Sequence, residues 1–220
     1  MSRTTRQATH SAQGLETAFD RFEPLRIRYA PNELICQSGS YAAGIYLITS
    51  GTVLETYASA MCEATPLATG LLCTGDLIGI APLSDSENML HQTSCRALSS
   101  VSLSFLERGA FSAALEVDTA LRRFLTAYLA SRSQRLIRVL WRTRLSADDR
   151  LRDLFLDLAH LGMGDNDIIR LPRELDLRLI ANLTGVPLRR ARQICSALQG
   201  VEWTDDGFRL SLDELSDPGT

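Results

Sequence analysis

The segment Asp176–Leu198, DLRLIANLTGVPLRRARQICSAL, most constrains what this chain of 220 residues can fold into. It has the pattern of two short amphipathic helices joined by a tight turn. Asp176 is placed to cap the first helix, because a carboxylate there accepts hydrogen bonds from free amide groups. Gly185 permits the positive φ that often ends a helix, and Pro187 suits the first position of the next helix. The pattern predicts a helix-turn-helix.

Each of these two helices has one apolar face. The apolar positions of the first, at i, i+3, i+4 and i+7, are Leu177, Ile180, Ala181 and Thr184. Those of the second are Ala191, Ile194, Cys195 and Leu198. The opposite face of the second helix carries Arg189, Arg192, Gln193 and Ser196, with Arg190 on its flank. Such donors can reach guanine edges or phosphates from a DNA major groove, although an Arg row is also common on an ordinary solvated helix.

Charge is unevenly distributed along the chain. Residues 122–192 hold 15 Arg against 8 acidic residues, a net charge of +7. Residues 1–121 (7 Arg, 12 acids) and 193–220 (1 Arg, 6 acids) each have a net charge of −5. The positive charge is therefore concentrated around the two-helix motif, as a nucleic-acid partner requires. A long Arg-rich surface helix is the alternative explanation.

Several other classes of protein do not fit the sequence. No apolar run approaches the ~20 residues that cross a bilayer, and the polar N-terminus lacks the apolar centre of a secretory signal. We therefore expect a cytoplasmic protein without a membrane partner. The five cysteines lack CxxC spacing, so buried thiols are expected rather than a zinc site or a disulfide framework. No nucleophile–base group, Gly-rich phosphate loop or carboxylate pair indicates an enzyme.

Residues 20–115 are expected to form a β-rich domain, preceded by a flexible arm over residues 1–19. Short runs rich in Ile, Val, Leu and Tyr alternate there with turn residues. In Gly44–Tyr57, one strand leads into Ser50-Gly51 and a second strand leaves it. Many short strands at this spacing predict an antiparallel barrel or roll.

Residues 116–144 are expected to form a long dimerisation helix. The sequence contains no Gly or Pro between Arg122 and Leu161. Apolar residues recur at three- and four-residue steps, and those assigned to the dimer interface are Leu121, Leu125, Tyr128, Leu129, Leu136 and Leu140. A coiled coil between two copies would cover this stripe. Packing of the helix on the β-rich domain of the same chain is the alternative.

Residues 145–220 are expected to form the C-terminal domain of an α+β protein. Ser146 begins a capping-box-like start to a helix that ends at Leu161. A short strand over residues 168–171 precedes the two-helix motif. After the motif, residues 201–203 and 208–212 predict a hairpin, because Asp-Gly between extended runs is a strong turn signal. A helix-turn-helix with such a hairpin is a winged helix, although Asp205 and Asp206 would oppose close approach of the hairpin to DNA.

Taken in order, these pieces resemble the CRP/FNR family of bacterial transcription regulators over about residues 20 to 215. The resemblance is carried by the long central helix and by three runs, Ile45-Tyr-Leu-Ile-Thr-Ser-Gly51-Thr-Val, Gly75-Asp-Leu-Ile-Gly79 and Leu179-Ile-Ala-Asn-Leu-Thr-Gly185. It implies a double-stranded β-roll of the cyclic-nucleotide-binding type, a dimerisation helix and a C-terminal winged helix-turn-helix. It also implies a homodimer that reads two half-sites of double-stranded DNA, with RNA polymerase as a further partner.

The chain departs from that family where effectors bind. Cyclic-nucleotide binders of the family have a Glu soon after the Gly-Asp-x-x-Gly run and later an Arg-Ser/Thr pair. Here Ile80 follows Gly79, and the later stretch His91-Gln-Thr-Ser94 has no Arg. We expect no cyclic AMP or cyclic GMP binding in the usual mode, since a buried phosphate needs a cationic partner. His91 is expected in a surface turn.

Other effectors of the family also find little support in the sequence. Residues 1–35 contain no cysteine for an FNR-type iron–sulfur cluster. We expect no bound cofactor or metal. A cysteine-based redox switch, or haem held by His10, His91 or a cysteine, is left open as an alternative.

The second helix of the motif departs from the family as well. Members often have a Glu near its start and a Ser-Arg pair one turn later, where this chain has Arg189 and Arg192-Gln193. A guanidinium favours guanine, so the operator should differ from the usual family sequences.

The residues assigned to base reading are Arg189, Arg192 and Gln193, with Ser196 on the same face. Phosphate contacts are assigned to Arg190, Arg173 and Arg178. Two alternatives stay open: a ligand-gated or redox-gated sensor, and an interaction scaffold that has lost DNA binding.

Overall fold

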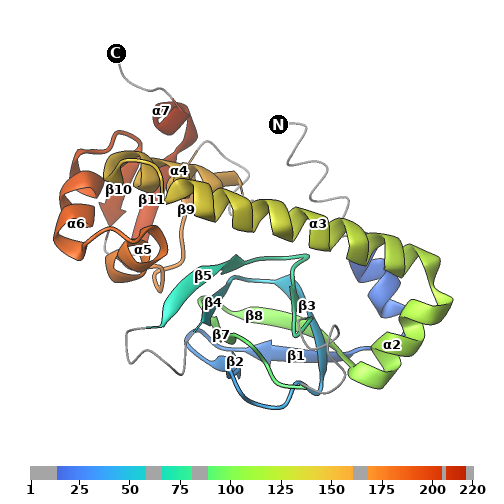
Figure 1. Cartoon of the computed structure of the whole chain (residues 1–220). Helices are drawn as coiled ribbons and strands as arrows, with labels where there is room; N and C mark the ends of the chain where they lie inside the picture. Colours follow the sequence, from blue (N-terminus) through green and yellow to red (C-terminus); the bar gives the residue numbers. More distant parts are fainter. Residues whose placement is uncertain (1–13, 58–65, 81–88, 161–167, 205–206, 217–220) are drawn as a thin grey trace. The chain divides into compact units, whose positions relative to one another are not determined.

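The structure, a computed structural model, describes residues 14–57, 66–80, 89–160, 168–204 and 207–216 (Figure 1). The chain divides into two compact units within one helix, α3 (Thr119–Arg142): unit 1 ends at Arg132 and unit 2 begins at Ser133. Each unit has a core of its own. None of the helices described has the length and hydropathy that a bilayer crossing would need.

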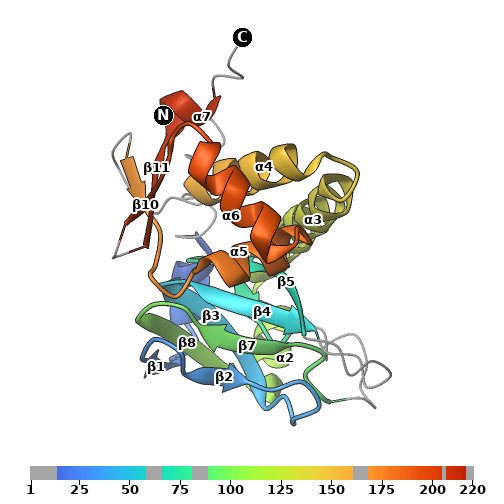
Figure 2. The ribbon, with the colours of Figure 1, turned by 90° about the vertical axis from the view of Figure 1, so that its left-hand side faces the viewer.

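Unit 1 contains two antiparallel four-stranded sheets, with strand orders β1-β8-β3-β6 and β2-β7-β4-β5 (Figures 1 and 2). The strands are β1 Leu25–Tyr29, β2 Leu34–Cys36, β3 Gly44–Ser50, β4 Val53–Tyr57, β5 Leu67–Leu72, β6 Leu77–Ile78, β7 Ser94–Ala97 and β8 Val101–Glu107. The sheets pack face to face, because one buried cluster draws Ile48 and Leu103 from the first sheet and Val53 and Cys95 from the second. This roll confirms the β-rich domain expected from the alternating short runs.

Helices cover the other face of the first sheet. They are residues 14–20, α2 (Arg108–Val117) and the first part of α3 (Thr119–Arg142). The rings of Phe19 and Phe111 lie 5.7 Å apart and are fully buried in a cluster with Leu47. The flexible arm was expected to extend to residue 19. This is wrong for its last residues, because Leu15 and Phe19 belong to the core. Residues 1–13, including His10, lie outside the described residues.

The residues of α3 assigned to the dimer interface lie on two different faces of the helix, one buried and one exposed. Leu121 and Tyr128 are buried in the core of unit 1, and Leu125 packs against that core. Of the other assigned residues, Leu129, Leu136 and Leu140 are exposed, as are Ile137 and Trp141. At 100° per residue, the directions of the three exposed leucines fall within about 40° of one another, whereas Leu121 and Tyr128 point elsewhere around the helix. The three- and four-residue spacing of the apolar residues suggested a single stripe, whereas the structure shows two separate faces of α3.

In the residues that the structure describes, unit 2 contains the end of α3 (residues 133–142), four further helices and one three-stranded antiparallel sheet of order β10-β11-β9. Its elements are α4 Ala147–His160, β9 Ile168–Arg170, α5 Leu177–Thr184, α6 Leu188–Ala197, β10 Val201–Thr204, β11 Gly207–Ser211 and α7 Leu212–Ser216. The short strand and the hairpin expected from the sequence are thereby confirmed. Phe155 of α4 and Phe208 of β11 are fully buried, with ring centroids 5.5 Å apart.

Ion pairs fix the end of α3 to α4 within unit 2. The buried Arg142 guanidinium donates to Asp153 at 2.7 Å and also to Asp157. Arg138, one turn earlier, donates to Asp157 at 2.7 Å. The next helix starts at a cap, because the Asp149 amide donates to the Ser146 hydroxyl at 3.2 Å, as the sequence predicts.

Candidate nucleic-acid interface

The turn between α5 and α6 is set by local sequence. The Asp176 carboxylate accepts a hydrogen bond from the Leu179 amide at 2.8 Å, which caps α5. Gly185 follows α5 in the left-handed conformation, at φ 64°. Pro187 lies one position earlier than expected, as the residue that precedes α6, and its carbonyl accepts from the Ala191 amide at 2.9 Å. These short-range constraints fix the angle at which α6 leaves α5.

The two helices bury the faces that the sequence predicts, except that Leu198 follows the end of α6 and is only half-buried. The buried residues of α5 are Leu177, Ile180, Ala181 and Thr184. Those of α6 are Ala191, Ile194 and Cys195. Because one face of α6 is locked into the core of unit 2, the opposite face is held outward. The residues exposed there are Arg189, Arg190, Arg192, Gln193 and Ser196.

One of the assigned arginines, Arg190, has a partner within the same chain. Arg190 donates to the Asp148 carboxylate, in the first turn of α4, at 2.8 Å, and both side chains are more than half exposed. Such a pair contributes little to stability because water screens it. Arg173 is exposed on the segment before α5. An incoming phosphate would compete with Asp148 for Arg190.

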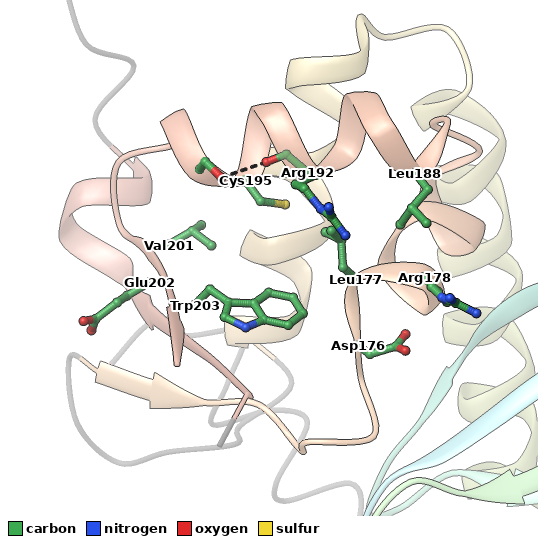
Figure 3. A pocket seen from close by; sticks show the side chains of 10 residues that line it. Asp176, Leu177, Arg178, Leu188, Arg192, Cys195, Val201, Glu202 and Trp203 are labelled. Atoms are coloured by element: carbon green, nitrogen blue, oxygen red, sulfur yellow. Dashed lines mark hydrogen bonds between the residues drawn. The ribbon is translucent and has the colours of Figure 1, made fainter. Parts of the chain in front are cut away.

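Arg178, Arg192 and Ser196 line one cavity of about 750 Å³ between α5, α6 and β10. Figure 3 shows Arg192 directed from α6 toward the Trp203 ring, whereas Arg178 projects away from that ring. Arg189, Arg190, Gln193 and Arg173 do not line it. The assigned residues are thus divided between this cavity, the open face of α6 and, for Arg173, the segment before α5.

Trp203 is a residue of this surface that the sequence analysis did not single out. Its side chain is 55% exposed, and its ring meets Phe208 edge-on at 4.5 Å. The sequence feature that could have identified it is a Trp within a strand of the predicted hairpin. Cys195 also lines the cavity, but burial raises the pKa of its thiol to about 11, so it stays neutral. Asp205 and Asp206, expected to oppose DNA, lie outside the described residues.

A second polar cluster lies inside unit 1, where Arg132 of α3 reaches Glu55 of β4. The Arg132 guanidinium donates to the two Glu55 carboxylate oxygens at 2.8 and 2.7 Å. The Thr93 hydroxyl donates to the same carboxylate at 3.0 Å, and Arg132 also donates to the Tyr128 hydroxyl at 3.3 Å. Burial raises the pKa of Tyr128, so its phenol stays neutral. The sequence offered no signal for this pair, because its members are 77 positions apart.

His91 and the cysteines that the structure describes are buried. His91 is only 6% exposed, which corrects its assignment to a surface turn; its backbone is held by Gly39 and Ser40 through hydrogen bonds of 2.8 and 2.9 Å. Four cysteines are buried as expected, namely Cys36, Cys73, Cys95 and Cys195, and Cys62 lies outside the described residues. Among the residues that the structure describes, no three His, Cys, Asp or Glu side chains are grouped to hold a metal ion.

Comparisons with known proteins match part of unit 1 and, separately, nearly the whole chain. Residues 26–118 match the family model of the cyclic nucleotide-binding domain. A search of curated proteins found no match to the chain. Several solved structures are similar over nearly the whole chain.

FixK2 from Bradyrhizobium japonicum has a TM-score of 0.73 at 16% identity, covering 90% of this chain and 99% of its own. The c-di-GMP-responsive global regulator CLP of Xanthomonas campestris has a TM-score of 0.69 at 20% identity, covering 90% and 99%. The CRP/FNR-family transcriptional regulator TTHA1359 of Thermus thermophilus has a TM-score of 0.67 at 15% identity, covering 87% and 96%. At these identities the likeness shows a shared fold. The resemblance in fold to a CRP/FNR-family protein is thus confirmed, and the roll of unit 1 matches the cyclic nucleotide-binding domain.

Proposed function

We propose that this protein is a homodimeric, sequence-specific DNA-binding transcription regulator. In this proposal α5, α6 and the β10–β11 hairpin form a winged helix-turn-helix, and α6 enters the major groove. The observation that carries the proposal is the outward face of α6, where Arg189, Arg192, Gln193 and Ser196 are held together. The shared fold and the concentration of positive charge over residues 122–192 support it.

The rigidity of α6 supports base reading rather than a loose electrostatic contact. Ile194 and Cys195 are buried behind the exposed face, and Ala191 is fully buried. Base readout requires side chains of defined position, because one misplaced donor loses the bidentate geometry that distinguishes guanine. Phosphate contacts, by contrast, need only positive charge near the backbone. We assign Arg189, Arg192 and Gln193 to bases and Arg190, Arg173 and Arg178 to phosphates.

A dimer would complete the site, since one α6 covers only one half-site. The exposed apolar residues of α3 supply a candidate interface, and Leu136 and Leu140 share one direction on the helix. The proposal places the protein in the cytoplasm, with RNA polymerase as a further partner.

Cyclic nucleotides are not part of this proposal. Arg132 is already matched by Glu55, which offers both carboxylate oxygens at hydrogen-bond distance. An anionic ligand would have to displace that carboxylate before it could use Arg132. The stretch after Gly79 continues into residues 81–88, which lie outside the described residues. The sequence departure and the internal pair together favour regulation without cyclic AMP.

The proposal is tested by selecting bound sequences from a random duplex DNA pool, with native mass measured on the same sample. We expect one enriched motif with two-fold symmetry and a mass of two chains on one DNA. The absence of any enriched sequence at low salt would support a scaffold that has lost DNA binding.

Arg189→Ala should change recognition at one operator position. We expect a cost of about 1–3 kcal/mol at that base pair and relaxed preference there, because one bidentate guanine contact is lost. Binding to the selected operator and to its single-base variants measures this change. An equal loss on all sequences would show that Arg189 contacts phosphate.

Arg190→Ala, on the neighbouring residue of the same helix, should behave differently. We expect similar weakening on all sequences and a salt slope reduced by about 1, because one phosphate contact is lost. Asp148→Asn is the matched variant: it frees Arg190 from its intramolecular partner, so binding should strengthen on every sequence. A base-specific effect of Arg190→Ala would contradict the assignment.

A further inference from the structure

Cys36 and Cys95 lie opposite each other on neighbouring antiparallel strands, β2 and β7. Directly opposite residues in such a pair have Cα atoms about 4.5–5.5 Å apart, within the roughly 4.4–6.8 Å that a disulfide spans. Both cysteines belong to the same buried cluster between the two sheets of unit 1, so their side chains share one face of the sheet. Both thiols are free in the structure. A bond between them would require little movement of the backbone.

The surroundings make the two thiols unequal. Hydrogen bonding from Cys95 lowers the pKa of Cys36 to about 5 against the opposing effect of desolvation, and the buried His91 lowers it further. Hydrogen bonding with Cys36, together with burial, raises the pKa of Cys95. The Cys36 sulfur also lies 3.9 Å from the Thr93 carbonyl oxygen, a weak contact that only the thiol form can donate. Ionisation of Cys36 therefore gives up that contact, while the interactions with Cys95 and His91 favour the thiolate.

The two residues also differ in access to solvent. Cys36 retains 7% exposure, whereas Cys95 has none. A small oxidant therefore meets Cys36 first. The thiolate is the reactive form of cysteine, so the more exposed of the two residues also holds the more reactive sulfur.

We propose that Cys36 and Cys95 form a peroxide-responsive thiol pair that closes to an intramolecular disulfide. The Cys36 sulfur attacks one oxygen of hydrogen peroxide, the O–O bond breaks, and the other oxygen leaves as water after taking a proton. This step gives a sulfenic acid at Cys36. The Cys95 sulfur then attacks the Cys36 sulfur, the S–O bond breaks, a second water leaves, and the S–S bond forms. Two thiols are oxidised and one peroxide is reduced to two waters.

The pair is placed to affect α3. On its other edge, β7 pairs with β4, and Cys95 lies opposite Glu55 in that ladder. Glu55 is the residue that holds Arg132 of α3, and Thr93, two residues before Cys95, donates to the same carboxylate. A bond that fixes β7 to β2 therefore restrains the strand that positions the Glu55–Arg132 pair. The thiol pair itself does not depend on the proposed DNA binding.

The test uses the full chain, reduced and then exposed to hydrogen peroxide. Remaining thiols are alkylated, and the protein is digested without reductant for mass spectrometry. We expect a Cys36–Cys95 cross-linked peptide that is lighter by two hydrogens, with the denatured protein still the mass of one chain. In Cys95→Ser the reaction should stop at a Cys36 sulfenic acid that dimedone traps. Before oxidation, Cys36 should be alkylated about tenfold faster than Cys95, because it holds the thiolate.

Control variants keep the outcome decisive. Cys73→Ala removes another buried cysteine of unit 1 and should leave the cross-link intact. Cys36→Ser and Cys36→Ala should both abolish it while circular dichroism shows an unchanged fold. A cross-link between other cysteines, a bond between two chains, or sulfenic acid at Cys95 in preference to Cys36 would overturn the proposal. Because the readout is chemical, it is independent of whether the random-pool selection finds an operator.

Discussion

Replacing Arg132 with methionine should destabilise unit 1 by about 3 kcal/mol, because it leaves the Glu55 carboxylate buried without its cation. Glu55 is only 11% exposed in its side chain, and Arg132 is 26% exposed. Thr93 and Thr69 would still donate to the carboxylate, at 3.0 and 3.2 Å, but neither supplies a charge. The partial exposure of Arg132 places the expected loss at the lower end of the ~3–5 kcal/mol typical of a broken buried pair.

Removing both charges should recover most of that loss. We expect Glu55→Gln with Arg132→Met to lie within about 1 kcal/mol of the wild type, since no ion is then left unpaired. Arg123→Met, an exposed arginine on the same helix, should change stability by less than about 0.5 kcal/mol. The single and double variants form a cycle that isolates the pair.

Denaturant unfolding measured in two ways distinguishes the units. Circular dichroism follows the whole chain, whereas both tryptophans, Trp141 and Trp203, report on unit 2. The expected result is an early loss of β signal with a tryptophan transition that moves less. If Arg132→Met left the free energy of unfolding unchanged, water rather than Arg132 would satisfy the hydrogen bonds of Glu55 in solution.

Leu140→Glu should convert the proposed dimer into a folded monomer and lower operator affinity about 10³-fold, or ~4 kcal/mol. Leu140 is 68% exposed, so a charge there costs the isolated chain little. In the proposed dimer the same position is buried against the partner's helix, where an unpaired carboxylate is expensive. A monomer retains one half-site of contacts, so specific binding falls toward the nonspecific level.

Gln134→Glu is the matched control for this variant. It adds the same charge to an exposed position on another side of α3 and should leave mass and affinity unchanged. Sedimentation equilibrium gives the oligomeric state, and titration with the selected operator gives the affinity. A dimer that persists in Leu140→Glu would show that the exposed apolar row of α3 is not the interface.

The motif α5–α6 could be predicted because its signals are local. Asp176, Gly185 and Pro187 act within one or two turns of chain, and the burial of Ile180 and Ile194 follows the helical repeat. The outward face of α6 was predictable for the same reason. Local capping and periodicity need no knowledge of what lies across the fold.

What the sequence did not reveal depends on contacts between distant residues. The helix at residues 14–20 is short, and Leu15 and Phe19 become core residues only because Phe111 lies beside them. The separation of Leu121 from Leu140 is invisible until the first sheet covers one side of α3. The facing of Cys36 and Cys95 depends on strand register, which a bulge between Leu34 and Cys36 sets.

The contact between Arg190 and Asp148 bears on how quickly the protein would search a genome. A phosphate at any sequence must compete with a carboxylate already 2.8 Å from the guanidinium. When a phosphate displaces it, the Asp148 carboxylate is still stabilised by the dipole of α4, because it lies in the first turn of that helix. The competition shortens every stay on random DNA alike, while base contacts prolong the stay at an operator. By competing weakly with phosphate for Arg190, Asp148 would thus leave more protein molecules free to sample new sites on DNA.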